Sequence, residues 1–132
     1  TVRENLALAT LRGKLPRLLP KNWIFPDQQF LALGADLDLT SMLDVSVGRL
    51  SGGQRQMIAF LMVILTKPQV LLLDEPTAAL SPEASISLMK MVKAYVQETS
   101  TPTLYITHDL SLVAQMKATA WSMVDGFITP IT

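Results

Sequence analysis

From residue 50 onward, apolar stretches of two lengths alternate along the chain and predict helices and strands in turn. The run 55–66 is long enough for a buried helix, which Lys67 and Pro68 end. The run 70–73 is short and continuous, as expected of a strand covered on both faces. Ser81 then caps a helix that begins at Pro82. Its apolar side chains recur at helical spacing and predict one buried stripe: Leu88, Met89, Val92, Tyr95 and Val96.

The same alternation continues after this helix. Residues 102–107 predict a second strand, 109–117 a short helix and 120–124 a third strand. Asp125-Gly126 predicts a hairpin turn into Phe127-Ile128. Strand and helix in alternation are typical of an α/β fold with a largely parallel sheet, in which ligands bind beyond the carboxyl ends of the strands.

The first fifty residues lack this alternation. Before residue 35, three prolines and two glycines separate short apolar stretches. They predict helices at 2–12, 27–34 and 38–45, and a loop at 13–26. This part of the chain is therefore expected to be mostly helical.

Composition narrows the function classes. Apolar residues make up 49% and charged residues 17% of the 132 residues, so a packed core is expected. The net charge is zero, which gives no overall field to attract nucleic acid, and no nucleic-acid partner is expected. Without cysteine, disulfides and thiolate metal sites are excluded. The longest apolar run, 57–65, falls short of the roughly 20 residues of a membrane span, so none is expected.

Charge is uneven near the start of the sequence. Residues 1–21 contain five basic side chains and one acid, Glu4. Two interpretations stay open: a solvated face, or a surface that faces lipid headgroups or a membrane partner. The basic residues are Arg3, Arg12, Lys14, Arg17 and Lys21.

Two carboxylates follow the first predicted strand directly. Asp74 at the tip of a buried strand could hold Mg²⁺, directly or through water, beside a nucleotide's phosphates. Glu75, pointing elsewhere, could orient or deprotonate an attacking water. The alternative is that both acids only cap the next turn.

Two further features are compatible with phosphate binding. Ser51-Gly52-Gly53 precedes the apolar run 55–66, and glycines beside a helix N-terminus let backbone N–H groups approach an anion. The same residues could serve only as a turn and cap. His108 is the only histidine and follows the second strand, where it could touch a terminal phosphate or have a structural role.

Together, these segments resemble the motifs of ATP-binding cassette (ABC) ATPases. Residues 50–56 are similar to the signature sequence, and 70–76 to the Walker B segment with its following glutamate. Residues 77–80 resemble the segment that leads into the D-loop, and 106–109 the H-loop. The first six residues resemble the stretch that follows the Q-loop, and the order and spacing of all segments agree with the family.

The resemblance implies a fold and a division of the chain. It implies an α/β protein with a partial P-loop NTPase (RecA-like) core, a largely parallel sheet and a mostly helical subdomain at the N-terminus. Residues 1–66 would form the helical subdomain, including the signature and its helix. Residues 67–132 would form the C-terminal part of the ATPase core, with Walker B, D-loop and H-loop.

The resemblance also implies roles for individual residues, with ATP and Mg²⁺ as cofactors. Asp74 would help to hold Mg²⁺, Glu75 would polarise the hydrolytic water, and His108 would contact the γ-phosphate. In this family two ATPase domains pair head to tail, so the signature contacts the ATP held by the opposite subunit. The residues that would make this contact are Ser51, Gly52, Gly53 and Gln54.

The sequence departs from the family in two respects. A phosphate-binding loop needs Gly-x4-Gly-Lys-Ser/Thr, whereas Gly13-Lys14 is followed by Leu15 and has Leu8 at the first glycine position. The Q-loop glutamine and the adenine-stacking aromatic residue are also not found. We therefore expect a C-terminal fragment of an ABC ATPase domain, with apolar surface left to be covered and no ATP hydrolysis by itself. Ser81 stands where the D-loop usually has aspartate.

The function that these features indicate is that of the ATP-binding and hydrolysing subunit of an ABC transporter. Residues 47–56 and 77–80 look similar to ATPases of bacterial importers for small substrates such as amino acids. The expected partners are a second ABC ATPase subunit and membrane-spanning permease subunits, at the inner face of the cell membrane in the cytoplasm. Two alternatives stay open: a non-transport ABC ATPase, whose coiled-coil branch is disfavoured by the lack of heptads in 1–50, or a degenerate ABC-like partner protein.

Overall fold

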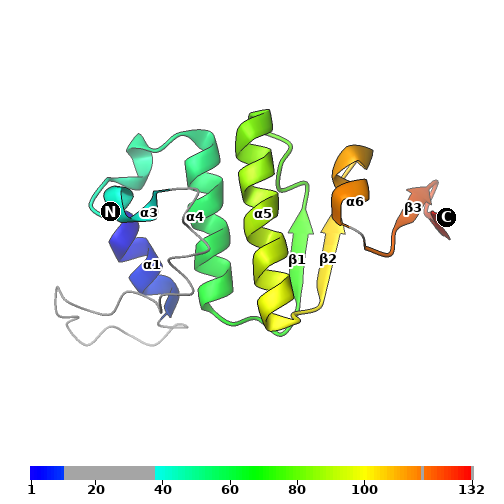
Figure 1. Ribbon diagram of the computed structural model, residues 1–132, viewed down its shortest axis with the longest axis horizontal. Helices are drawn as coiled ribbons and strands as arrows, with labels where there is room; N and C mark the ends of the chain where they lie inside the picture. Colours follow the sequence, from blue (N-terminus) through cyan, green and yellow to red (C-terminus); the bar gives the residue numbers. More distant parts are fainter. Residues whose placement is uncertain (11–37, 117, 132) are drawn as a thin grey trace.

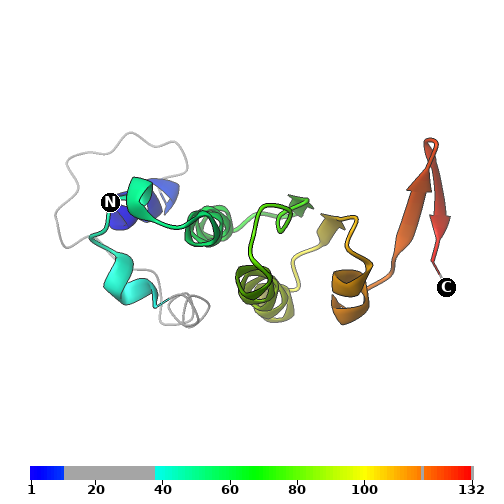
Figure 2. The ribbon, with the colours of Figure 1, turned by 90° about the horizontal axis from the view of Figure 1, so that it is seen from above.

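The helices and strands lie in a row that begins with α1 and ends in a β-hairpin, as both views show (Figures 1 and 2). The structure is a computed structural model that describes residues 1–10, 38–116 and 118–131. The helices are α1 (Val2–Thr10), α3 (Leu39–Met42), a 3₁₀ turn (Val47–Arg49), α4 (Gly52–Leu65), α5 (Pro82–Thr99) and α6 (Leu110–Met116). The strands are β1 (Leu71–Asp74), β2 (Thr103–Ile106), β3 (Trp121–Val124) and β4 (Phe127–Pro130).

Helix α1 packs against α4 and is tied to the segment after α3. The backbone N–H of Val2 donates to the carbonyl of Val45, and that of Arg3 to the carbonyl of Leu43, both at 2.9 Å. Val2 and Leu6 are buried and belong to the same apolar cluster as the buried residues of α4. The Arg3 guanidinium forms an exposed ion pair with Asp44, with Nε 3.0 Å from Oδ1. The first ten residues are thus a fixed part of the helical end of the molecule.

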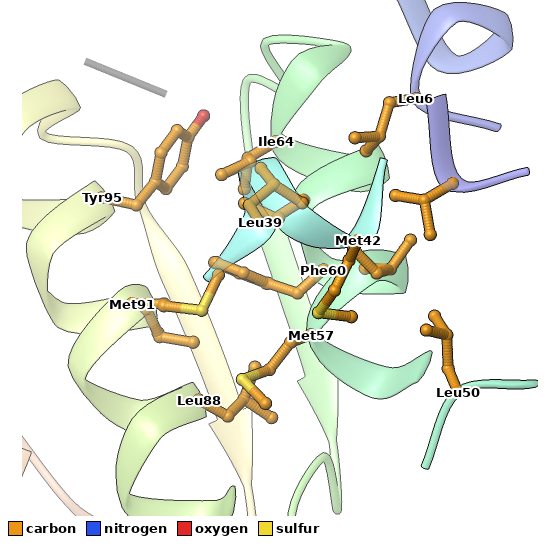
Figure 3. Packing of buried hydrophobic residues seen from close by; sticks show 14 of the residues in the cluster. Leu6, Leu39, Met42, Leu50, Met57, Phe60, Ile64, Leu88, Met91 and Tyr95 are labelled. Carbon is orange, nitrogen blue, oxygen red and sulfur yellow. The ribbon is translucent and has the colours of Figure 1, made fainter. Parts of the chain in front are cut away.

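The core extends from α1 and α3 across α4 to α5, and the last two helices run side by side in the same direction (Figure 1). Figure 3 shows their apolar side chains meeting turn by turn, Met57 beside Leu88 at one level and Phe60 beside Met91 at the next. The rings of Phe60 and Tyr95 meet edge to face, with centroids 6.3 Å apart. The stripe expected on α5 is confirmed: four of its members are buried and Val96 packs against the core.

Strands β1 and β2 form a parallel pair, joined through α5, with Leu71 opposite Thr103 and Asp74 opposite Ile106. In Figure 2, α5 lies on one side of this pair. The opposite face is open among the described residues: Leu72 is 70%, Leu104 49% and Ile106 52% exposed. The expectation of a strand covered on both faces is therefore wrong for this part of the chain. The run of leucines fits burial, but the face that carries Leu72 and Leu104 is left uncovered by the described elements.

The predicted hairpin is confirmed at the far end of the row. β3 and β4 pair antiparallel, with Val124 opposite Phe127. Asp125 and Gly126 both have positive φ, 50° and 80°, as the tight turn of a two-residue hairpin requires. β3 was expected to extend the parallel sheet, whereas it pairs only with β4 in the described structure and lies beyond α6 from β2 (Figure 1).

The remaining sequence predictions differ from the structure mainly in their bounds. The helix expected at 55–66 begins three residues earlier, at Gly52. The helix expected at 38–45 is confined to Leu39–Met42, because the chain then turns toward α1, with the N–H of Val45 bonded to the carbonyl of Met42. The loop at 13–26, the helix at 27–34 and the basic residues Arg12, Lys14, Arg17 and Lys21 lie outside the described residues.

The search for a membrane-crossing helix gave a negative result. Within the described ranges, no helix combines the length and the apolar character that crossing a membrane demands.

Candidate functional site

The first candidate group lies at the N-terminal end of α4. Ser51 is the N-cap: its Oγ accepts the N–H of Gln54 at 3.1 Å, and Gln54 Oε1 accepts the N–H of Ser51 at 2.9 Å. This reciprocal pair is a capping box. Because α4 begins at Gly52, both glycines lie in the first turn, where N–H groups have no carbonyl partner within the helix. Together with the helix dipole, these groups form an end that favours an anion.

The chain before this end is also fixed. Arg55 Nη1 donates to the carbonyl oxygen of Leu50 at 2.7 Å, and the Leu50 side chain is buried in the core. The exposed residues at the helix start therefore stand on an anchored backbone, so Ser51 and Gly52 face solvent in a defined position.

The second candidate group lies at the carboxyl end of β1. Asp74 is the last residue of the strand, and its side chain is exposed. The N–H of Glu75 donates to the carbonyl of Ile106 at 2.9 Å, which extends the pairing with β2 by one bond. Glu75 itself has φ of 43°, a left-handed conformation that is uncommon for a residue with a side chain. Such local strain is often found at functional positions.

This conformation brings Glu75 to His108, which follows β2. Glu75 Oε1 accepts the backbone N–H of His108 at 3.0 Å and lies 2.8 Å from the ring Nδ1. The hydrogen bond and the charge of Glu75 raise the pKa of the exposed His108 ring. The other carboxylate oxygen, Oε2, is buried and has no protein partner among the described residues. A buried carboxylate oxygen without a partner is costly, so this atom is suited to bind a water or a ligand group.

The segment after Glu75 is folded into two successive turns. The N–H of Ala78 donates to the carbonyl of Glu75, and the N–H of Leu80 to that of Thr77, both at 3.1 Å. The hydroxyl of the buried Thr77 lies 3.4 Å from the Tyr105 hydroxyl on β2. The sequence does not predict this contact between Thr77 and Tyr105. Its one signal is the alternation of the strand at 103–106, which places Tyr105 on the inward side.

Ser81 ends this segment as the N-cap of α5, and its Oγ accepts the N–H of Ala84 at 3.3 Å. The predicted start of α5 is confirmed, with Pro82 in its first turn. The hydroxyl therefore fulfils the capping role in the place where the family usually has aspartate.

Asp109 is the other acid near His108, and it is used locally. Its Oδ1 accepts the N–H and the hydroxyl of Ser111, at 2.9 and 2.6 Å, and these bonds lower the pKa of Asp109. It therefore stabilises the start of α6, while Glu75 is the acid that contacts the histidine.

The Asp74 carboxylate could hold Mg²⁺ together with oxygens that the protein does not supply. In the part of the chain that the structure describes, no three His, Cys, Asp or Glu side chains gather as a metal site. Mg²⁺ commonly takes only one or two carboxylates and completes its shell with phosphate oxygens and water. One exposed carboxylate, that of Asp74, beside a Glu75–His108 pair agrees with that pattern. The start of α4 belongs to a separate element, and no hydrogen bond of the described residues joins it to this group.

Comparisons with known proteins agree on one family. The sequence model described as ABC transporter matches residues 1–78. The tyrosine transport ATP-binding protein of Clostridioides difficile (strain R20291) is 43% identical over 118 residues, which are 87% of this chain and 46% of that protein. The phosphonates import ATP-binding protein PhnC of Nitratidesulfovibrio vulgaris (strain Hildenborough) is 32% identical, over 85% of this chain and 43% of that protein.

A solved structure shows the same architecture. A nucleotide-free ATP-binding cassette from an ABC transporter superposes with a TM-score of 0.68 at 25% identity, covering 97% of this chain and 53% of that one. The chain thus spans about half the length of the relatives it matches. The likeness to this ATP-binding cassette confirms the expected α/β class with a P-loop NTPase core. With the family model matching more than half of the residues, the chain belongs to the ABC transporter family.

Proposed function

We propose that this protein is the ATP-hydrolysing subunit of an ABC transporter that imports a small substrate, such as an amino acid, into a bacterium. The observation that carries the proposal is the contact of Glu75 with His108 at the tip of β1, directly beside Asp74. The relative named for phosphonate import supports the direction of transport, and the relative named for tyrosine transport supports a transport role. These two relatives are named for different substrates. The proposal of an amino acid as the substrate therefore rests on the higher identity to the tyrosine protein.

In this proposal Glu75 orients the water that attacks ATP. Its Oε1 is held by the backbone and the ring of His108, which leaves the buried Oε2 to accept a hydrogen bond from the water. An oriented carboxylate can also take up a proton from that water as the reaction proceeds.

His108 would contact the γ-phosphate through the opposite side of its ring. Because Nδ1 is engaged with Glu75, the free ring nitrogen is Nε2. The raised pKa of the ring favours the protonated form, in which Nε2–H donates to an anionic oxygen. The side chain is exposed, so a phosphate can reach it.

Asp74 would hold Mg²⁺, directly or through water. When bound, Mg²⁺ neutralises charge on the phosphate oxygens of ATP. The exposed position of the Asp74 carboxylate at the strand end leaves room for a hydrated ion and its phosphates.

The signature residues Ser51, Gly52, Gly53 and Gln54 would contact ATP held by a second ATPase subunit in a head-to-tail dimer. The capping box fixes the Ser51 and Gln54 side chains, while first-turn N–H groups remain for the phosphate. A site that needs another subunit's nucleotide explains why this anion-favouring helix end lies on an exposed surface apart from Glu75.

The chain would divide into a helical subdomain, 1–66, and part of the ATPase core, 67–132. The packing of α1 on α4 supports the first unit, and the parallel β1–β2 pair supports the second. Membrane-spanning permease subunits would dock on the helical subdomain, with the protein peripheral on the cytoplasmic face of the membrane. The 132 residues contain no phosphate-binding loop motif, so we expect them to hydrolyse no ATP when isolated.

Purification of the complete native protein from its host tests the proposal. Extracted from membranes in mild detergent, a tagged copy should bring down a membrane-spanning partner and hydrolyse ATP in that complex. Recovery with ribosomes or DNA, without a membrane partner, would contradict the transporter and favour a non-transport ABC ATPase. A complex with a membrane partner but without ATP hydrolysis would favour a degenerate partner protein.

A further inference from the structure

The N-terminal ends of α4 and α5 approach each other more closely than side chains normally allow. A Cβ atom added to Gly53 would lie 2.7 Å from the Cβ of Ala84. The same atom added to the neighbouring Gly52 would meet nothing within 4 Å. Among the described residues, packing therefore requires a glycine at position 53 but not at position 52.

The rest of the helix pair leaves little freedom to absorb a change at this point. Below Gly53 and Ala84, the two helices are held by buried side chains that meet level by level, from Met57 and Leu88 down to Phe60 and Tyr95 (Figure 3). Packed interiors transmit strain because they are dense. A larger side chain at the contact would therefore push the two N-terminal ends apart, because the packed pair has no free space to absorb it.

Each of these ends leads to one of the two candidate groups. Gly53 lies inside the capping box that holds Ser51 and Gln54. Ala84 donates its N–H to the cap residue Ser81. From Ser81 the two hydrogen-bonded turns lead back to Glu75 within six residues. The close approach of Gly53 and Ala84 thus lies between the helix ends that lead to the two groups.

We propose that Ala84 is a positioning residue: its single methyl group seats the Gly53 backbone and so fixes the signature end of α4 relative to Glu75 at the tip of β1. The role in ATP hydrolysis rests on the proposed function. If each nucleotide lies between the Glu75 group of one subunit and the signature of the other, this distance sets whether both sites of a dimer can close together. Misplacement of a reacting group by about 1 Å can cost roughly 100-fold in rate.

A double-mutant cycle, measured as Tm on the complete native protein, tests the contact itself. Gly53→Ala should lower Tm by roughly 2–8 °C, the range expected for overpacking by one methyl group. Gly52→Ala is the matched control and should not lower Tm, because its added methyl meets open space. Ala84→Gly, added to Gly53→Ala, should recover most of the loss because it removes the opposing methyl group. Equal effects at the two glycines, or strictly additive effects in the double variant, would overturn the contact.

Kinetics in the assembled ATPase test the positioning role. Ala84→Val should lower kcat at least tenfold and leave the Kd for ATP within about twofold, since it touches no proposed ATP contact. Ala84→Gly should lower kcat less than Ala84→Val does, because it removes the methyl group that seats the Gly53 backbone but adds no bulk at the contact. Ala59→Val is the control: it makes the same chemical change on the exposed side of α4 and should leave kcat unchanged.

The outcomes separate this proposal from the proposed function. If Ala84→Val lowers Tm but leaves kcat unchanged, Ala84 is only a structural residue and the positioning role is wrong. If the unsubstituted assembly hydrolyses no ATP, the proposed function is wrong and the catalytic part of this inference falls with it. In that case the double-mutant cycle of Tm values still decides whether Gly53 and Ala84 form the contact.

Discussion

Glu75 Oε1 accepts the backbone N–H of His108 and lies 2.8 Å from its ring Nδ1. The parallel pairing of β1 and β2 brings Glu75 and His108 together. The left-handed backbone at Glu75 aims its side chain across the strand ends, toward the residue that follows β2. The backbone on both sides of the contact is thus held by hydrogen bonds, while the buried Glu75 Oε2 has no partner among the described residues.

The titration of His108 should report this contact. Glu75, and more weakly Asp109, raise the pKa of His108 above its ordinary value of 6.5. A histidine whose pKa is higher in the folded than in the unfolded protein contributes stability that is complete below the unfolded pKa and is lost as pH rises through the folded pKa. In NMR spectra of the ring protons, the midpoint should lie above about 6.5.

Substitution of the acid should reverse that shift. In Glu75→Gln the His108 midpoint should move down toward the ordinary value, because the partner charge is removed. Asp109→Asn should have the smaller effect, since its carboxylate is bonded to Ser111. A midpoint in Glu75→Gln equal to that of the unsubstituted protein would show that the contact does not form in solution.

Ser81 should matter for stability as a helix cap. Ser81→Ala removes the acceptor of the Ala84 N–H and should cost about 1 kcal/mol of unfolding free energy. Ser81→Asp, which restores the residue usual for the family, should cost little because aspartate caps equally well. Urea unfolding of the three proteins measures both. Equal losses in the two variants would contradict the capping role.

Ser100 offers a stabilising change at the other end of α5. It is the C-cap residue and adopts a left-handed conformation, with φ of 54°. Glycine occupies this conformation without the strain of a side chain, so Ser100→Gly should raise the unfolding free energy by roughly 0.5–1 kcal/mol. Thr99→Gly, one residue earlier within the helix, should lower it. Calorimetry of both variants should give Tm shifts of opposite sign.

Leu61 and Val63 on α4 test which side of this helix faces the hydrophobic core. Leu61 has none of its surface exposed, and Leu61→Ala should cost about 2–5 kcal/mol through lost burial and the cavity left behind. Val63 is 46% exposed on the same helix, and Val63→Ala should cost less than about 1 kcal/mol. A similar loss for both in urea unfolding would contradict the orientation of α4.

The sequence predicts helix starts and turns, which depend on the residues at that point in the chain. It does not predict features that depend on contacts between distant parts of the chain. Pro82 after Ser81, and Asp125-Gly126 between two apolar strands, each specify a helix start or a turn by their own backbone preferences. Leu72 shows the limit, because a continuous run of leucines cannot tell which face another element covers.

The candidate site divides in the same way. The sequence places Glu75 and His108 at neighbouring strand ends, since parallel strands end at the same edge. It cannot predict their hydrogen bonds, which depend on the left-handed backbone at Glu75. Nor does it show that Gly53 differs from Gly52, because the contact with Ala84 comes from the packing of two helices that are far apart in the sequence.

The central claim is that Glu75 acts on the water that hydrolyses ATP, and a phosphate-release assay of the complete native protein with Glu75→Gln tests it most directly. Glu98→Gln, an equal change at the exposed end of α5, is the control and should keep the parental rate. We expect Glu75→Gln to lower kcat by about 10²–10⁴, the usual contribution of a positioned acid or base, and to accumulate an ATP-bound dimer. Hydrolysis at the parental rate in Glu75→Gln would contradict the account.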